Sequence, residues 1–260
     1  MFKPIEIRSK GKGVEMELKG RNNGQVIVFI HGILEDARQF RKLEELAHHE
    51  GYGTCLFHLP GHGGSSQYFA KTSYKAWIQY VSRNIRRLAR QYEEMILVGH
   101  SMGALLAICE ATNNPRHIKA LFLIDPPLSV HIWPRVIKSA LTISFGKIKD
   151  SQPYTKAEYH AMGVEPLRLR DSIGWLRRYS ELLSIVGYTR KQICKIHLPM
   201  FVVFAAKDEF VSIKGRKYFK NYQGKLEVLY LLDSGHFCYH HSDLITLERF
   251  YLKFIKSHKE

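Results

Sequence analysis

The sequence has no long apolar segment. Nowhere in its 260 residues does it approach the roughly 18 to 20 consecutive apolar residues that a membrane-spanning helix needs. The first dozen residues carry charged side chains with no apolar run between them, so they do not resemble a signal peptide. These absences predict a protein without integral membrane association, and a cytoplasmic location is the expectation.

Cysteine is scarce as well. The four residues, Cys55, Cys109, Cys194 and Cys238, are widely spaced, with no C-x-x-C pair and no cluster at the spacing of metal ligands. A disulfide framework is not expected at this chain length, and buried free thiols are the interpretation that we favour. Cys238 is not flanked by the sharp turn that a nucleophile needs, so we expect it to pack. Neither a metal nor a cofactor is predicted.

Acidic residues are outnumbered, with 24 Asp and Glu against 39 Lys and Arg, which gives a formal net charge of +15. No nucleic-acid-binding motif accompanies this excess, so no nucleic-acid partner is predicted. Part of the excess lies on a predicted helix at residues 74–91, where four arginines share one face: Arg83, Arg86, Arg87 and Arg90. The opposite face is apolar, so we interpret the arginine row as a solvated helix surface. A docking patch for an acidic partner is the alternative.

What the sequence does contain is a regular alternation of strands and helices. Near-continuous apolar runs occur at residues 25–31, 54–58, 95–98, 118–124, 200–205 and 226–232. Helical patterns follow most of them, at about residues 37–49, 74–91, 213–222 and at the carboxyl end. Such alternation predicts an α/β fold with a mostly parallel central sheet and helices on both faces. Residues 4–18 alternate apolar and polar around Gly11-Lys12-Gly13, which predicts an antiparallel hairpin at the edge of the sheet.

The alternation stops between about residues 127 and 198. Apolar side chains there recur at helical spacing from Trp133 to Leu141 and from Trp175 to Val186, with no convincing strand between. This segment holds 12 Lys or Arg against 5 Asp or Glu. We therefore expect a core formed by residues 1–126 and 199–260, and a basic helical cap, or lid, formed by residues 127–198.

Residues 96–104 form the most informative stretch. An apolar strand runs into Gly99-His100-Ser101-Met102-Gly103 and then into an apolar helix, the pattern of a nucleophile elbow. Ser101 would lie at the apex of a strained turn, where the amino end of the helix faces any developing anion. The two glycines have a steric reason, because strand and helix approach closely at such a turn.

Polar residues follow three strands in the order Ser101, Asp208 and His236. The carboxyl ends of parallel strands meet at one edge of the sheet, so we expect these side chains to converge. A serine hydroxyl is a weak nucleophile, so His236 would accept its proton while Asp208 fixes the imidazole tautomer. Asp125 also follows a strand and is the alternative acid. The oxyanion would be bound by the backbone N–H groups of Met102 and Ile33.

Four motifs together resemble the α/β-hydrolase family: His31-Gly32, the segment Leu59-Pro60-Gly61-His62-Gly63-Gly64-Ser65, the elbow, and the pair of Asp208 with Gly235-His236. The chain is most similar to small carboxylesterases and monoacylglycerol-lipase-like enzymes that carry a helical cap. The resemblance implies a serine hydrolase that cleaves a small carboxylic ester. One departure is His58, where many relatives carry an acidic residue.

Other side chains are candidates for contact with substrate. They are His31 and Gly32 beside the oxyanion loop, and Trp133, Trp175 and Tyr179 in the cap. The three aromatic residues also fit the core of a helical lid. Glu35 and Asp36, beside the oxyanion loop, could also touch substrate, but we interpret them as the start of the helix that follows, because acidic residues are favoured in a first turn.

Two further functions stay open at this point. The basic cap would suit an acyl group delivered on an acidic carrier, such as an acyl carrier protein or a coenzyme A thioester. The other function is that of a binding protein, which keeps the pocket but catalyses no reaction. The sequence does not exclude C–C cleavage or lyase chemistry, for which some relatives use the same triad.

Overall fold

The computed structural model describes residues 16–20, 24–113, 115–131 and 133–259. Most of the hairpin predicted for residues 4–18 lies outside these ranges. Its last part is described as strand β1 (Met16–Lys19), which pairs antiparallel with β3 at one edge of the sheet. The predicted edge position is therefore confirmed for the part that the structure describes.

A seven-stranded sheet forms the centre of the molecule, in the order β1-β3-β2-β4-β5-β6-β7. All neighbours other than β1 and β3 pair in parallel. The strands after β1 are β2 (Gln25–Ile30), β3 (Gly53–Phe57), β4 (Glu94–His100), β5 (Ile118–Ile124), β6 (Met200–Ala205) and β7 (Leu226–Leu231). Strands β2 to β6 are buried along most of their length, which explains why the sequence shows near-continuous apolar runs there.

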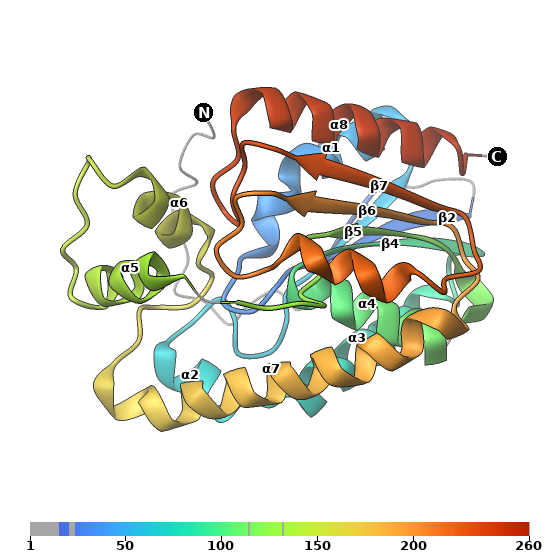
Figure 1. Ribbon diagram of the computed structural model, residues 1–260. Helices are drawn as coiled ribbons and strands as arrows, with labels where there is room; N and C mark the ends of the chain where they lie inside the picture. Colours follow the sequence, from blue (N-terminus) through green and yellow to red (C-terminus); the bar gives the residue numbers. More distant parts are fainter. Residues whose placement is uncertain (1–15, 21–23, 114, 132, 260) are drawn as a thin grey trace.

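Helices cover both faces of the sheet (Figure 1). On one face lie α1 (Arg41–His49) and α8 (His241–Lys256), and on the other lie α3 (Tyr74–Leu88), α4 (Met102–Asn113) and α7 (Ser172–Gln192). Successive side chains of β4 lie on opposite faces of the sheet. Met95 and Leu97 pack in the apolar cluster on one face, and Ile96 and Val98 pack in the cluster on the other. The predicted fold class is confirmed.

Short elements complete the described chain. The helix α2 (Ser66–Lys71) was not predicted, because it lies in a loop rich in glycine and serine; the Ser65 side chain caps it. The 3-10 helices are η1 (Ala37–Phe40), η2 (Pro115–His117), η3 (Leu169–Asp171), η4 (Ile193–Lys195) and η5 (Ile213–Phe219). The helix expected near residues 213–222 is thus a 3-10 helix.

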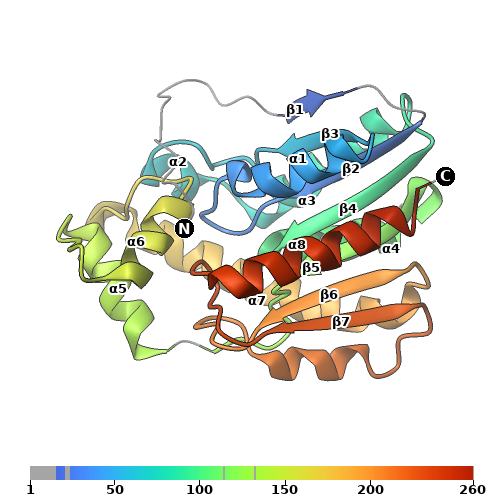
Figure 2. The same ribbon diagram turned by 90° about the horizontal axis from the view of Figure 1, so that it is seen from above.

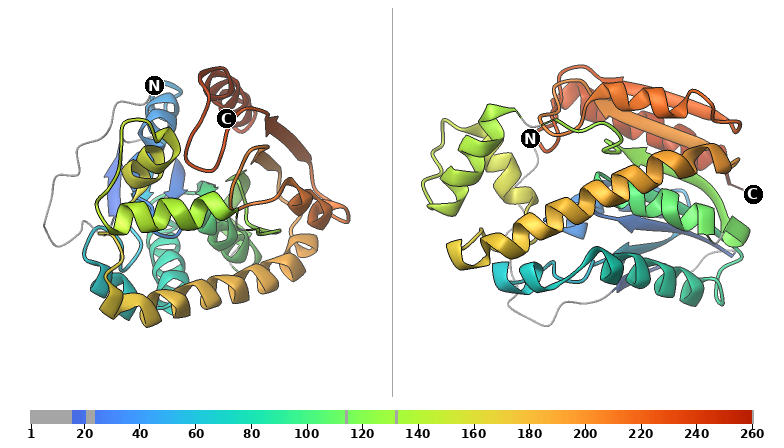
Figure 3. Two further views of the ribbon diagram at one scale, coloured as in Figure 1. Left: turned by 60° about the vertical axis from the view of Figure 1, so that its left-hand side comes forward. Right: turned by 60° about the horizontal axis from the view of Figure 1, so that its bottom comes forward.

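The cap lies beyond the carboxyl ends of the parallel strands (Figure 2). It contains α5 (Pro134–Ser144), as expected, and α6 (Pro153–Ala161), which was not predicted because its residues form no clear apolar stripe. The third helix, α7, begins in the cap and continues along the face of the sheet beside α4 (Figure 3). Its second half buries Ile185 and Val186 in the core, so one helix belongs to both parts of the fold. The boundary at residue 198 stays a prediction.

Surface and thiol predictions have mixed outcomes. The four arginines of the predicted row are exposed, although α3 ends at Leu88 and Arg90 lies beyond it; Trp77, Val81, Ile85 and Leu88 of α3 are buried, as expected. All four cysteines are free, but only Cys55 and Cys109 are buried; Cys194 is exposed and Cys238 is half-buried. None of the described helices combines the length and apolar character that a membrane crossing requires.

Candidate active site

Ser101 lies at a strained turn between β4 and α4. Its backbone has a φ of 52°, in the left-handed region that a non-glycine residue rarely adopts. Its N–H donates to the carbonyl of Ile124 over 2.9 Å, which fixes the turn to the neighbouring strand. A Cβ on Gly99 would lie 2.6 Å from the Ala104 backbone, and one on Gly103 would overlap the Ile30 carbonyl. The steric reason predicted for both glycines is confirmed.

Asp208 and His236 are hydrogen-bonded to each other. Nδ1 of His236 lies 2.6 Å from Oδ2 of Asp208, and both side chains are buried. The other oxygen, Oδ1, accepts the amides of Phe210 and Val211 at 2.7 Å each, so the carboxylate is held from two sides. Because the carboxylate accepts the Nδ1–H, the neutral ring carries its lone pair on Nε2.

Asp125, the alternative acid, has other partners. Its Oδ1 accepts the amide of Ala205 at 2.6 Å, and Oδ2 accepts the hydroxyl of Tyr239 at 3.5 Å. Burial and the nearby Asp208 carboxylate raise the pKa of Asp125 to about 7. Asp208 is therefore the acid whose geometry suits His236.

The hydroxyl of Ser101 has no hydrogen-bond partner among the residues that the structure describes. The ring of His100, its neighbour in the chain, lies 4.8 Å from the ring of His236, centroid to centroid. The structure thus brings the serine and the histidine to the same end of the sheet without joining them by a hydrogen bond. Hydrogen bonds of this kind are often long in enzymes without ligand.

The loop after β2, which contains Ile33, is held by two histidines. Nε2 of His31 accepts the amide of Leu59 at 3.0 Å, while Nδ1 donates to the Gly32 carbonyl at 2.8 Å. Nε2 of His62 accepts the amide of Leu34 at 3.0 Å. Burial lowers the pKa of both histidines, so they stay neutral acceptors. His31 therefore supports the loop, and its predicted contact with substrate stays a prediction.

The next two residues are Met102, the other predicted oxyanion donor, and His58, which stands where many relatives carry an acidic residue. As the first residue of α4, Met102 has an amide that no carbonyl of the preceding turn of helix can accept, which leaves it available for an oxyanion. His58 pairs with Glu17 of β1 at 3.1 Å between Nε2 and Oε1. The segment 59–65 is thus supported by His31 and His62 rather than by an acidic residue at position 58.

Glu35, which we interpreted from the sequence as part of a helix start, lies in the site. Its buried carboxylate accepts the amide of Gly32 at 2.5 Å, the side-chain amide of Gln39 at 2.5 Å and Nδ1 of His100 at 2.8 Å. Its Oε1 also lies 3.9 Å from Nε2 of His236. A Cβ on Gly32 would overlap this carboxylate, which explains the glycine.

Of Glu35 and Asp36, which were both predicted to begin the helix, only Asp36 does so. Oδ1 of Asp36 accepts the amide of Arg38 at 2.8 Å, as an N-cap does. Burial of Glu35 raises its pKa, but the contacts with His100, His236 and Gln39 outweigh burial and lower the pKa to about 2. A helix needs only one N-cap residue. The presence of a second acidic residue beside Asp36 was therefore the sequence signal that Glu35 has another role.

The cap is hydrogen-bonded to loops on both sides of the site. The segment that leads into it meets the Asp208 loop, where amides of His131 and Trp133 donate to carbonyls of Phe210 and Glu209 at 2.9 and 3.3 Å. The segment after α6 meets the loop that contains Ile33, where the amide of Gly163 donates to the Leu34 carbonyl at 2.7 Å. The position of the cap is therefore coupled to both loops.

Glu209 links the cap to His236 directly. Its Oε2 accepts the backbone amide of His236 at 3.2 Å and an N–H of Arg135 from α5 at 3.3 Å. The guanidinium of Arg135 stacks between the rings of Trp133 and Tyr154, at 4.5 and 4.1 Å from their centroids. Trp133 is thus a packing partner of Arg135 and remains 40% exposed.

The other aromatic candidates differ from each other. Trp175 is buried against Phe69, with centroids 5.1 Å apart, and its Nε1 donates to the Ser66 carbonyl at 3.2 Å. Its contacts therefore join α7 to α2 and give no support to a role in substrate binding. Tyr179 remains 40% exposed on α7. Its role stays a prediction.

Two clusters of His, Asp and Glu side chains have ligand atoms close enough to hold a metal ion: Glu35, His100 and His236, and Asp125, Asp208 and His236. Both share His236, whose Nδ1 is already bound to Asp208, and the Glu35 oxygens already accept three N–H groups. The expectation of no metal stays a prediction.

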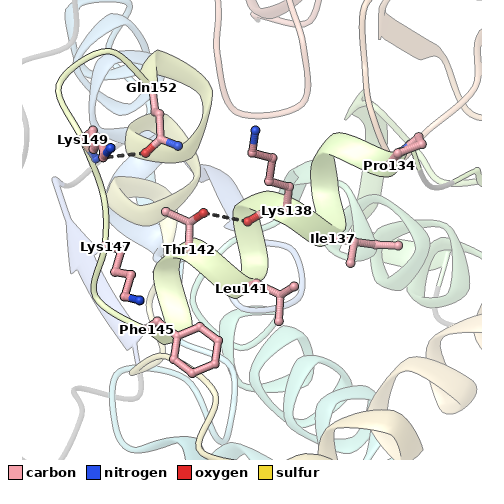
Figure 4. Close-up of a pocket in the computed structure, with 9 residues that line it drawn as sticks. All are labelled: Pro134, Ile137, Lys138, Leu141, Thr142, Phe145, Lys147, Lys149 and Gln152. Carbon is pink, nitrogen blue, oxygen red and sulfur yellow. Dashed lines mark hydrogen bonds between the residues drawn. The ribbon is translucent and has the colours of Figure 1, made fainter.

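A separate hollow of about 540 Å³ lies on the cap (Figure 4). Its apolar lining comes from Ile137, Leu141 and Phe145 of α5 and the residue after it, and its lysines are Lys138, Lys147 and Lys149. None of the residues proposed for catalysis lines it. This hollow is therefore a feature of the cap surface, distinct from the buried site.

The chain is similar in sequence and in structure to several known proteins. The family described as serine aminopeptidase, S33, matches residues 21–236. A monoglyceride lipase homolog of Monkeypox virus is 25% identical to this chain over 210 residues, which cover 75% of each chain. Phospholipase YtpA of Bacillus subtilis is 27% identical over 203 residues, which cover 72% of this chain and 77% of the phospholipase. The monoacylglycerol lipase of Paleococcus ferrophilus superposes with a TM-score of 0.71 at 21% identity, over 94% of this chain and 98% of that chain.

Proposed function

Since the chain belongs to the serine aminopeptidase S33 family of α/β hydrolases, we propose that it cleaves a carboxylic ester through an acyl-enzyme on Ser101. The prediction of a hydrolase of this fold is confirmed by the family match. The bond cleaved, the catalytic residues and the order of steps are the proposal.

The observation that carries the proposal is the 2.6 Å hydrogen bond between Asp208 and His236 at the end of the sheet where Ser101 occupies its strained turn. This bond leaves Nε2 of His236 free to accept a proton. A buried serine with a φ of 52° is typical of a nucleophile held on an elbow.

The reaction then has two steps. Oγ of Ser101 attacks the ester carbonyl while Nε2 of His236 takes the hydroxyl proton, and the oxyanion is bound by the amides of Ile33 and Met102. When the C–O bond to the alcohol breaks, the alcohol leaves with that proton. Water, deprotonated by His236, attacks the acyl group, and the carboxylic acid departs as the proton returns to Oγ.

An ester is the proposed substrate because the relatives are named as lipases of monoglycerides and phospholipids. The family description names an aminopeptidase, so a peptide bond is the alternative that the same triad would cleave. Hydrolysis rates of p-nitrophenyl esters and of aminoacyl p-nitroanilides, measured side by side, separate the two. We expect the esters to be cleaved faster.

The test is a chain-length series of p-nitrophenyl esters with wild-type protein, Ser101→Ala and the exposed control Ser184→Ala. We expect Ser101→Ala to lose ester hydrolysis and the control to keep it. Ester hydrolysis that survives in Ser101→Ala contradicts the proposal. Tight retention of a ligand with no turnover in wild-type protein would favour a binding protein instead.

A second candidate substrate is an acyl group on an acidic carrier. The cap hollow favours it, because Lys138, Lys147 and Lys149 surround apolar side chains there (Figure 4). Attraction between charges weakens as salt is added, so turnover of a carrier-bound acyl group should fall more steeply with salt than turnover of a free ester. An equal response of both substrates would reject this candidate. Lys147→Gln should lower turnover of the carrier-bound acyl group, and Lys42→Gln, on α1, is the control that should not.

A further inference from the structure

We propose that Glu35 is a positioning residue for His236, whose buried negative charge stabilises the protonated imidazole that forms during catalysis. The inference rests on the proposed function, since it takes His236 as the base. Glu35 would act through His236 and would not itself exchange a proton with substrate.

The first observation is the position of the carboxylate. The ring of His236 lies between two acids: Asp208 is 2.6 Å from Nδ1, and Oε1 of Glu35 is 3.9 Å from Nε2. Nε2 is the nitrogen that takes the serine proton. A negative charge near this atom favours the imidazolium over the neutral ring, and the attraction is strong because both side chains are buried.

The second observation is that the Glu35 charge is solvated by neutral donors. Gly32 and Gln39 donate N–H groups at 2.5 Å each. Among the residues that the structure describes, the basic side chains within 4.0 Å of the carboxylate are His100 and His236. No lysine or arginine of the described chain therefore neutralises the charge.

The third observation concerns His100, which contacts the same carboxylate. Nδ1 of His100 lies 2.8 Å from Oε1 of Glu35, while its Nε2 is buried and has no hydrogen-bond partner among the described residues. The ring of His100 also lies 4.8 Å from the ring of His236, centroid to centroid. Oε1 of Glu35 therefore lies beside both imidazole rings.

Other charged and titratable groups also act on His236. Asp208 and Asp125 raise its pKa together with Glu35, and burial opposes them. Glu209 accepts its backbone amide and Glu158 contributes from α6. Among these, Glu35 is the acid whose oxygen lies 3.9 Å from Nε2, so its removal should change the basicity of that atom.

This role has a characteristic pH signature. Replacement of the charge lowers the pKa of His236, so the base becomes active at lower pH. The same replacement weakens stabilisation of the imidazolium in the transition state, so the plateau rate at high pH falls. Only part of the positive charge has developed on the imidazole in the transition state. The fall in the pKa of His236 is therefore larger than the fall in the logarithm of the plateau rate. The two rate profiles should therefore cross.

The experiment compares wild-type protein, Glu35→Gln and the control Asp36→Asn, which removes one charge from the same loop and retains an N-cap residue. The readout is the rate at which a fluorophosphonate labels the protein, measured against pH, which requires no knowledge of the natural substrate. We expect the midpoint for Glu35→Gln to fall by about one pH unit, with slower labelling at high pH and equal or faster labelling at low pH. The control should keep the wild-type midpoint.

Slower labelling of Glu35→Gln at every pH with an unchanged midpoint would overturn the inference and leave Glu35 as a structural support of the Gly32 loop. NMR titration of the His236 ring in wild-type protein and Glu35→Gln gives the same comparison without any reaction, and equal pKa values would also overturn it. Absence of labelling in wild-type protein would instead reject the proposed function, so the two failures are distinguishable.

Discussion

The amide of Gly163, in the cap, donates a 2.7 Å hydrogen bond to the carbonyl of Leu34, in the loop proposed to bind the oxyanion. Leu34 has a left-handed φ of 63°, and its own amide is held by His62. The same Gly163 accepts the amide of Gly63 through its carbonyl at 2.5 Å. One residue of the cap thus contacts both loops that frame the elbow.

Gly163→Ala should therefore lower catalysis through the oxyanion loop. A Cβ at this position would overlap the Glu35 carbonyl, so the loop or the cap must move. We expect kcat to fall by about tenfold or more, up to the roughly 10²- to 10³-fold that complete loss of one oxyanion donor produces. The measurement is ester hydrolysis under saturating substrate.

Gly187→Ala is the matched control, because a Cβ there meets nothing within 4 Å and alanine favours the helix. It should keep full activity and unfold at an equal or higher temperature. A Gly163→Ala protein with wild-type kcat would contradict the coupling between cap and oxyanion loop.

Asp208→Asn should reduce kcat by about 10³ to 10⁴, because the amide no longer fixes the correct tautomer of His236. Asp125→Asn is the comparison, since Asn keeps the acceptor for the Ala205 amide. Its effect should stay below about tenfold, the factor that 1.4 kcal/mol represents. If Asp125→Asn proves the more damaging change in steady-state assays, the assignment of the acid is reversed.

Glu35 should also influence stability in acid. Its pKa is lowered from 4.5 to about 2 in the folded protein, so its stabilising contribution is complete above pH 4.5 and is lost as pH falls toward 2. Glu35→Gln removes this contribution, and the free energy of unfolding should then decline less between about pH 5 and pH 3 than in wild-type protein.

Urea unfolding at several pH values measures this difference. The exposed Glu45→Gln is the control and should follow the wild-type curve. Parallel curves for wild-type protein and Glu35→Gln would show that the carboxylate is not held in its charged form by the fold.

The sheet was predictable because strands buried on both faces leave continuous apolar runs, as in β2 and β6. The elbow was predictable because its two glycines are demanded by contacts within a few residues or with the adjacent strand. The small helix α6 has no such local signature, since its side chains are largely polar and its position depends on the rest of the cap.

The contacts of Glu35 with His100 and His236 were not predictable for a related reason. Its partners His100 and His236 lie 65 and 201 positions away in sequence, and an acidic residue before a helix has an adequate local explanation in capping. Only the fold shows that Asp36 fulfils that need. The extent of the cap was difficult for a different reason, because α7 is one uninterrupted helix that leaves no break in the pattern at the junction.

Whether Ser101 is the nucleophile is tested most directly by mass-spectrometric location of the adduct that a fluorophosphonate forms on native protein. We expect a single adduct on the peptide that contains Ser101, absent from Ser101→Ala and from protein unfolded before treatment. An adduct on another residue, or none on active wild-type protein, would contradict the assignment of Ser101 as the nucleophile.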